Sequence, residues 1–150
     1  MRVVAHNDSP VLGGGEVWLV RLLGGLARRG HGVRLLCRSP ALVAHAGFAG
    51  IEAGTIALRG DAMLPLALLA ARRLRALAPD AVLLTTLQKV WLGGIAARCA
   101  RVPRVLARHA IAKPVPGRWT YRLAFRHLID GLVVNTGGVR DVVLARSPEL

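Results

Sequence analysis

The sequence predicts an α/β fold in which a doubly wound, mostly parallel sheet of about six strands has helices on both faces. Short apolar runs alternate with longer segments of helical periodicity along all 150 residues, which is typical of strands joined by covering helices. The first of these runs is short and apolar throughout, as buried parallel strands are. A glycine triplet and an amphipathic helix follow it, and this order of strand, glycine loop and helix is where anions bind in such folds.

The first half of the chain supplies three strands and the helical segments between them. Glu16–Arg29 is the clearest helix, because its leucines recur at the i, i+3, i+4, i+7 spacing, and Gly30 is suited to end it. Within it Gly24 and Gly25 weaken helix formation, so close packing against the sheet is expected there. The remaining segments are strands at Arg2–His6, Val33–Cys37 and Thr55–Leu58, a helix or loop at Ala41–Gly50, and a helix at Ala62–Leu77 with Pro65 in its first turn.

The second half of the chain continues the alternation. Strands are expected at Ala81–Thr85, Arg104–Arg108 and Leu132–Asn135, and helices at Val90–Ala100, Arg118–Ile129 and from a Thr136 cap to Arg146. No internal repeat or low-complexity tract interrupts the pattern. We therefore expect one Rossmann-like domain over residues 1–150.

Composition and charge narrow the possible partners. With 53% hydrophobic residues the chain is globular, and its net charge of +13 favours nucleic acid, anionic lipid headgroups or phosphorylated substrates. No basic run is interleaved with aromatic residues, so nucleic acid is not the expected partner. Cys37 and Cys99 stand in no metal or redox spacing, and we expect buried, inert thiols in a reducing compartment.

Membrane-spanning segments and signal peptides are not expected. The longest uncharged apolar run, Ala62–Ala71, is far shorter than the ~20 residues that cross a bilayer, and the N-terminus leads directly into a strand. The expected location is cytoplasmic, with at most peripheral contact with a membrane. Such contact would use the basic stripe at i, i+4, i+8 on one helix, unless the stripe is only a solvated face: Arg118, Arg122 and Arg126, with Trp119 beside them.

Candidate binding residues gather where the strands end. In a doubly wound sheet the crevice lies at the carboxyl ends of the strands, and Gly13–Gly15 offer bare backbone N–H groups there. Their spacing excludes the GxGxxG dinucleotide fingerprint, and a tight turn is the simpler alternative. Asp8 either orients a ligand hydroxyl or closes an Asx turn. The other candidates at this edge are Asn7, Thr85, Thr86, Arg108, His109, Asn135 and Thr136.

Five segments, in order, resemble the N-terminal domain of a GT-B glycosyltransferase of the family 4 type. They are Gly13–Glu16, close to a GGAE loop; Leu26–Val33, close to LAxRGHxV; Ala78–Val82, close to RPDVV; Val102–His109, a strand ending in histidine; and Ile129–Leu144, close to ADxVIVxSEGVRDxL. Together they span residues 13–144, which is almost the whole chain. The sequence departs from the family at Leu83–Thr86, where many relatives carry histidines.

The resemblance implies the acceptor-binding half of a glycosyltransferase. Such an enzyme moves a sugar from a nucleotide-sugar donor to a lipid-linked or polysaccharide acceptor, with retention, in cell-envelope glycan synthesis. It implies that His109 is catalytic and faces the transferred sugar. It also implies that Gly13, Gly14 and Gly15 approach the donor phosphates or the acceptor. The implied acceptor-binding residues are Asn7, Asp8, Thr85, Thr86, Arg108, Asn135 and Thr136.

The resemblance also bears on cofactors and on domain organisation. No metal or other cofactor is implied, because a helix dipole and basic side chains stabilise the leaving diphosphate. The donor is gripped by a C-terminal domain with an acidic EPxGxxxxE segment, which these 150 residues do not include, so the chain alone is expected to be inactive.

Two other functions stay open. The chain could be a non-catalytic binding module or partner subunit with the same fold. It could also be a basic peripheral protein on anionic membrane or nucleic acid, whose binding would fall steeply with salt.

Overall fold

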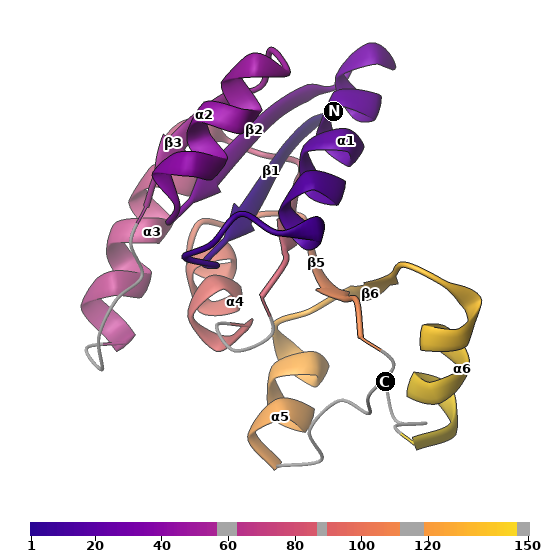
Figure 1. Ribbon diagram of the computed structural model, residues 1–150. Helices are drawn as coiled ribbons and strands as arrows, with labels where there is room; N and C mark the ends of the chain where they lie inside the picture. The colour runs from indigo at the N-terminus through magenta and orange to yellow at the C-terminus, as the bar shows by residue number, and fades with distance from the viewer. Residues whose placement is uncertain (57–62, 87–89, 112–118, 147–150) are drawn as a thin grey trace.

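The computed structural model describes residues 1–56, 63–86, 90–111 and 119–146, and strands and helices alternate through them (Figure 1). Within these residues the strands form one parallel sheet in the order β3-β2-β1-β4-β5-β6. The elements are β1 (Arg2–Asn7), α1 (Gly14–Arg28), β2 (Gly32–Cys37), α2 (Pro40–Phe48), β3 (Glu52–Thr55), α3 (Met63–Leu77), β4 (Ala81–Leu84), α4 (Val90–Cys99), β5 (Arg104–His109), α5 (Trp119–His127), β6 (Gly131–Val134) and α6 (Gly137–Arg146).

The helices cover the two faces of the sheet, and neighbouring residues of β1 show how. Ala5 packs into a core with Leu19 and Leu23 of α1. Val4, one residue earlier, packs into a second core on the opposite face, which contains residues of α3, α4 and α5. Alternate residues of a strand point to opposite faces, so a wholly apolar strand such as β1 supplies both cores. The predicted doubly wound α/β fold is confirmed.

The strand order places the expected crevice beside β1. β1 pairs with β2 on one side and with β4 on the other, and α3 carries the chain from β3 across to β4. The loops after β1 and β4 therefore lead to helices on opposite faces of the sheet. Such a reversal opens a crevice outside the carboxyl ends of the two strands.

One predicted strand was misplaced. The expected Thr55–Leu58 strand lies instead at Glu52–Thr55, and residues 57 and 58 fall outside the described part of the chain. The strand starts early because α2 ends in a turn at Gly50, whose φ is +70°. Among the described strands it pairs with β2 alone, at the sheet edge, and its Glu52 forms an ion pair with Arg34. An edge strand needs little apolar surface, so the apolar pattern located it poorly.

Of three other local expectations, two are confirmed and one is wrong. Ala41–Gly50 is largely helical, because Ser39 caps α2 by accepting a hydrogen bond from the Leu42 N–H at 3.4 Å. Cys37 is buried as expected, and burial raises the pKa of its thiol to about 11. The expectation of burial was wrong for Cys99, which is exposed near the end of α4.

Close helix packing at glycine occurs in a different helix from the one expected. A Cβ built on Gly24 would meet only the Arg28 guanidinium, at 3.6 Å, so α1 is not pressed onto the sheet there. In α4, a Cβ on Gly94 would lie 2.9 Å from Leu128 Cβ. Gly94 therefore lets α4 approach the end of α5.

Candidate functional site

Asn7 ties together the elements that surround the crevice. It ends β1 and is only 2% exposed. Its Nδ2 donates to Thr85 Oγ1 at 2.9 Å and to Glu16 Oε1 at 3.2 Å. Thr85 Oγ1 in turn donates to the carbonyl oxygen of His6 at 3.0 Å. The crevice therefore has a rigid polar floor made from β1, α1 and the segment after β4.

The glycine loop presents the N-terminus of α1 to this edge. Gly13 is the N-cap residue, and its N–H donates to Glu16 Oε2 at 3.0 Å. The first N–H groups of a helix lack partners within the helix, and they carry the positive end of its dipole. A Cβ on Gly14 would meet no atom within 4 Å, so among the described residues the space beside this turn is open to a ligand.

The Asx turn after β1 is made by Asn7, not by Asp8. Asn7 Oδ1 accepts a hydrogen bond from the Ser9 N–H at 2.9 Å, which is an Asx bond. Asp8 cannot make the same bond two residues ahead, because Pro10 has no N–H. Asp8 is buried, and its N–H donates to Thr86 Oγ1 at 3.3 Å. The loops after β1 and β4 are thereby joined at the crevice.

The ends of β5 and β6 bring four more candidates to the same edge. Arg108 Nε donates to Asn135 Oδ1 at 3.1 Å, and its Nη1 donates to the Gly15 carbonyl oxygen at 3.4 Å. His109, the next residue, is 6% exposed and points to the opposite face of the sheet because strand residues alternate. Thr136 caps α6 by accepting from the Val139 N–H at 3.3 Å, as predicted. The glycine loop thus contacts Arg108.

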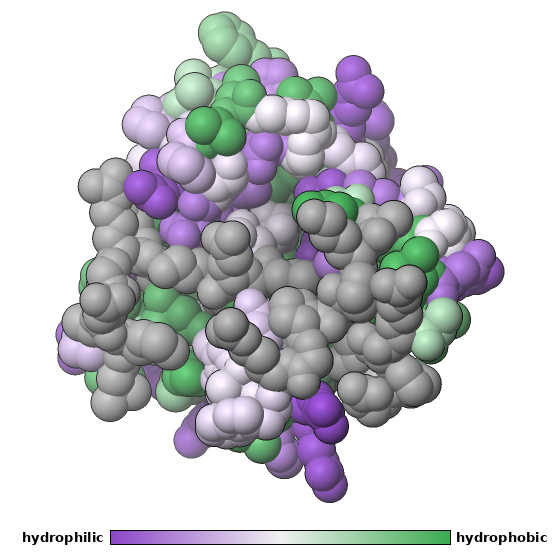
Figure 2. All heavy atoms as spheres, turned by 60° about the horizontal axis from the view of Figure 1, so that its bottom comes forward, coloured by the Kyte–Doolittle hydropathy of each residue, from purple (hydrophilic) through white to green (hydrophobic). Residues whose placement is uncertain are grey.

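The edge toward which β1 and β2 run is turned to the viewer in Figure 2, where hydrophilic and hydrophobic residues are intermixed over the described surface. Within the described residues no group of three or more His, Cys, Asp or Glu side chains could hold a metal ion. The polar groups at this edge that the structure describes are amide, hydroxyl, guanidinium, imidazole and backbone N–H groups, with single carboxylates. This set suits sugar hydroxyls and phosphate oxygens.

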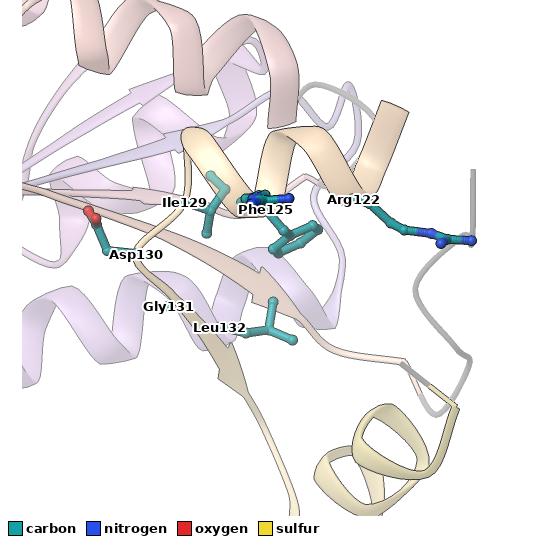
Figure 3. Close-up of a pocket in the computed structure, with 7 residues that line it drawn as sticks. Arg122, Phe125, Ile129, Asp130, Gly131 and Leu132 are labelled. Atoms are coloured by element: carbon teal, nitrogen blue, oxygen red, sulfur yellow. The ribbon is translucent and has the colours of Figure 1, made fainter. Parts of the chain in front are cut away.

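The expected membrane contact falls on α5, the helix that follows β5. Trp119 is 73% exposed at the start of α5, and Arg118 lies outside the described residues. A cavity of about 420 Å³ opens between α5 and β6, with Arg122 and Arg126 among its lining residues. In Figure 3 the apolar floor of this cavity is visible, and the Arg122 side chain extends away from it. No helix in the described parts of the chain has both the length and the apolar character needed to cross a membrane.

Two residues, Glu16 and Trp18, were not assigned to the site from the sequence. The sequence placed Glu16 at the start of the first helix, whereas its carboxylate also accepts a hydrogen bond from Asn7 Nδ2. Trp18 lies beside Arg108, whose Cζ is 4.1 Å from the centroid of the Trp18 ring. The capping-box spacing, with Glu three residues after the N-cap, was a signal for the first. No local pattern signals Trp18, because its partner Arg108 lies on β5, far away in the sequence.

Comparison with known families gives a match over most of the chain. The sequence profile of Glycosyltransferase Family 4 matches residues 12–148. No curated protein sequence matches the chain significantly.

Solved structures share the fold at low sequence identity. HepE of Anabaena, in complex with UDP and glucose, has a TM-score of 0.75 at 14% identity, over 98% of this chain and 41% of its own. The lipopolysaccharide outer core galactosyltransferase WaaB has a TM-score of 0.69 at 9% identity, over 98% and 43%. UDP-GlcNAc 2-epimerase from Neisseria meningitidis, bound to UDP-GlcNAc, has a TM-score of 0.66 at 14% identity, over 98% and 43%. The chain thus spans less than half the length of each, and the same fold occurs in a galactosyltransferase and in an epimerase.

Proposed function

The chain belongs to glycosyltransferase family 4, and on this basis we propose that it is the acceptor-binding half of an enzyme that transfers a sugar from a nucleotide-sugar donor. The observation that carries the proposal is the arrangement after β1, where the open first turn of α1 adjoins the hydrogen-bonded cluster built on Asn7. The solved structure of HepE with UDP and glucose supports a nucleotide sugar as the donor. The likeness to WaaB supports a cell-envelope acceptor, which we propose to be lipid-linked or polysaccharide.

The residues of the crevice divide the work by their chemistry. The N–H groups of Gly14 and Gly15 and the dipole of α1 attract a donor phosphate. Asp8 and Thr86, with Asn135, hydrogen-bond acceptor hydroxyls at the same edge. His109 lies close to the transferred sugar. The leaving diphosphate needs no metal in this scheme, because helix N–H groups and basic side chains stabilise its charge as it develops, and the sugar is transferred with retention.

A C-terminal domain is proposed to hold most of the donor, so the chain by itself binds acceptor without transferring sugar. Surface plasmon resonance with immobilised chain and a panel of envelope glycans and lipid-linked oligosaccharides tests acceptor binding. A radiolabelled-sugar assay on the same preparation tests turnover. Absence of glycan binding would overturn the acceptor assignment. Sugar transfer by the 150-residue chain would overturn its assignment as half of an enzyme.

The role of His109 is tested in the complete protein that contains both domains. We expect His109→Ala to lower kcat by at least a hundredfold, because a group at the reaction centre acts on the transition state. The thermal midpoint should fall only slightly. His127→Ala on the exposed end of α5 is the matched control. A near-normal transfer rate for His109→Ala would remove His109 from the reaction centre.

We also propose that the protein is cytoplasmic and attaches to an anionic membrane. The exposed Trp119, at the start of the basic helix α5, favours this attachment. We expect Arg122→Glu/Arg126→Glu to weaken sedimentation with phosphatidylglycerol vesicles, since each basic residue near such a surface contributes about 1 kcal/mol. Arg28→Glu/Arg29→Glu at the end of α1 changes the net charge equally and is the control. Equal losses in both variants would reduce the effect to overall charge.

A further inference from the structure

The Arg108 side chain joins three elements that are distant in sequence. Its guanidinium carbon lies 4.1 Å from the centroid of the Trp18 ring on α1. Its Nη1 reaches the carbonyl oxygen of Gly15 in the first turn of the same helix, and its Nε reaches Asn135 after β6. Arg108 is only 6% exposed, although arginine is rarely buried without partners. The planar group is therefore fixed by stacking and by two of its donors.

Gly15 leaves room for this guanidinium because it has no side chain. A Cβ at this position would lie 3.3 Å from Arg108 Nη1 and 3.9 Å from Nη2, whereas a Cβ on Gly14 would meet nothing within 4 Å. The two glycines thus differ in role: Gly14 leaves space for a ligand, and Gly15 admits an arginine from 93 residues later in the chain. A glycine that only closes a turn would not need that second property.

The charge of Arg108 is balanced within the same cluster. Burial lowers the pKa of its guanidinium, and the nearby carboxylate of Glu16 opposes that change. Arginine stays protonated in proteins, so a positive charge lies beside the positive end of α1. Glu16 is itself held by the Gly13 N–H and by Asn7 Nδ2. An anion on the loop would add a second favourable partner for a charge that the protein already holds in place.

We propose that Arg108 is a positioning residue for the glycine loop. It fixes the first turn of α1 against the ends of β5 and β6, and it places a positive charge beside the loop without touching the ligand. The loop then offers its N–H groups to a phosphate in one orientation. The identity of that phosphate rests on the proposed function, whereas the fixing of α1 does not.

Hydrogen exchange in the unliganded chain tests the fixing of α1. We expect Arg108→Met to raise amide exchange at residues 14–18 at least fivefold and to leave β1 and β4 unchanged. Arg108→Lys should raise it similarly, because lysine keeps the charge but lacks the planar stacking and the fork of donors. Arg104→Met, on the same strand at the opposite edge, is the control and should change nothing. Unchanged exchange in Arg108→Met would overturn the proposal.

Pyrophosphate, titrated against the chain and followed by the Gly14 amide signal, tests the effect on anion binding. Arg108→Met should weaken the affinity about tenfold, as expected for the loss of one buried charge near the anion, and Arg108→Lys should recover part of that loss. Failure of the wild-type chain to bind pyrophosphate would contradict the proposed phosphate role of the loop. The exchange measurement would still decide whether Arg108 positions it. Equal affinities for wild type and Arg108→Met would overturn the electrostatic part.

Gly15→Ala reaches the same contact from the other side, and it applies even where Arg108→Met folds poorly. Its Cβ would lie 3.3 Å from Arg108 Nη1, so the guanidinium must shift, and exchange at residues 14–18 should rise in the same direction as in Arg108→Met. In the Arg108→Met background the same change should have little further effect, because the contact is already lost. An equal effect of Gly15→Ala in both backgrounds would show that the two residues act independently and would overturn the proposal.

Discussion

Acidification should destabilise the protein through one buried histidine. His6 lies on β1, and 7% of it is exposed. Its Nε2 has no hydrogen-bond partner among the described residues. It lines a cavity of about 20 Å³ whose other walls are apolar: Leu36, Ile56, Ala70, Leu74, Val82, Leu84, Gly93 and Ala96. These surroundings disfavour the charged imidazole, and burial lowers the pKa of His6 from 6.5 to about 4.

The sign of the effect follows from proton uptake. Between pH 6.5 and about 4 the unfolded chain carries a proton on His6 that the folded protein does not. Protonation of His6 therefore leaves the free energy of unfolding unchanged at neutral pH and lowers it progressively as the pH falls through this range. The difference between the two pKa values corresponds to on the order of 3 kcal/mol at its limit. That is a large part of the 5–15 kcal/mol that stabilises a typical domain.

The variant His6→Leu isolates this contribution. Urea unfolding followed by circular dichroism at pH 7, 6, 5 and 4.5 gives the free energy of unfolding for each protein. We expect His6→Leu to equal wild type at pH 7 within about 1 kcal/mol, since leucine suits the apolar walls, and to lose much less stability on acidification. His127→Leu, at an exposed histidine, should retain the wild-type dependence. Parallel curves for wild type and His6→Leu would refute the reasoning.

Two further substitutions test packing and capping. Gly94→Ala should destabilise by about 1–3 kcal/mol, because its Cβ would lie 2.9 Å from Leu128 Cβ, which no rotamer change can move. Gly24→Ala on α1 should stabilise by up to about 1 kcal/mol, because its Cβ would make only an ordinary contact with the Arg28 guanidinium. Shifts of the same sign in urea unfolding would contradict this comparison. Glu16→Gln should cost about 1–2 kcal/mol, because one amide oxygen cannot replace both acceptor oxygens, and an unchanged urea midpoint would show that the carboxylate is not needed.

The sequence predicted the fold because its signals are local. Helical spacing of leucines located α1, and apolar runs located the buried strands β1, β2, β4, β5 and β6 to within a residue or so. The edge strand β3 was misplaced because it buries little and carries no such run. The glycines of α1 were misread for a related reason: whether a glycine is needed depends on what lies opposite, and only the structure shows that Leu128 faces Gly94.

The sequence by itself determined that the chain is a doubly wound α/β domain and that its polar candidates gather at the carboxyl edge of the sheet. That rule needs only the order of strands, loops and helices along the chain. Only the tertiary structure decided which of these residues meet. Asn7 finds Thr85 because β1 pairs with β4, and Gly15 finds Arg108 because β5 places its last residues beside α1. The order of the strands in the sheet brings together residues that are 78 and 93 positions apart. No periodicity of the sequence extends over such distances.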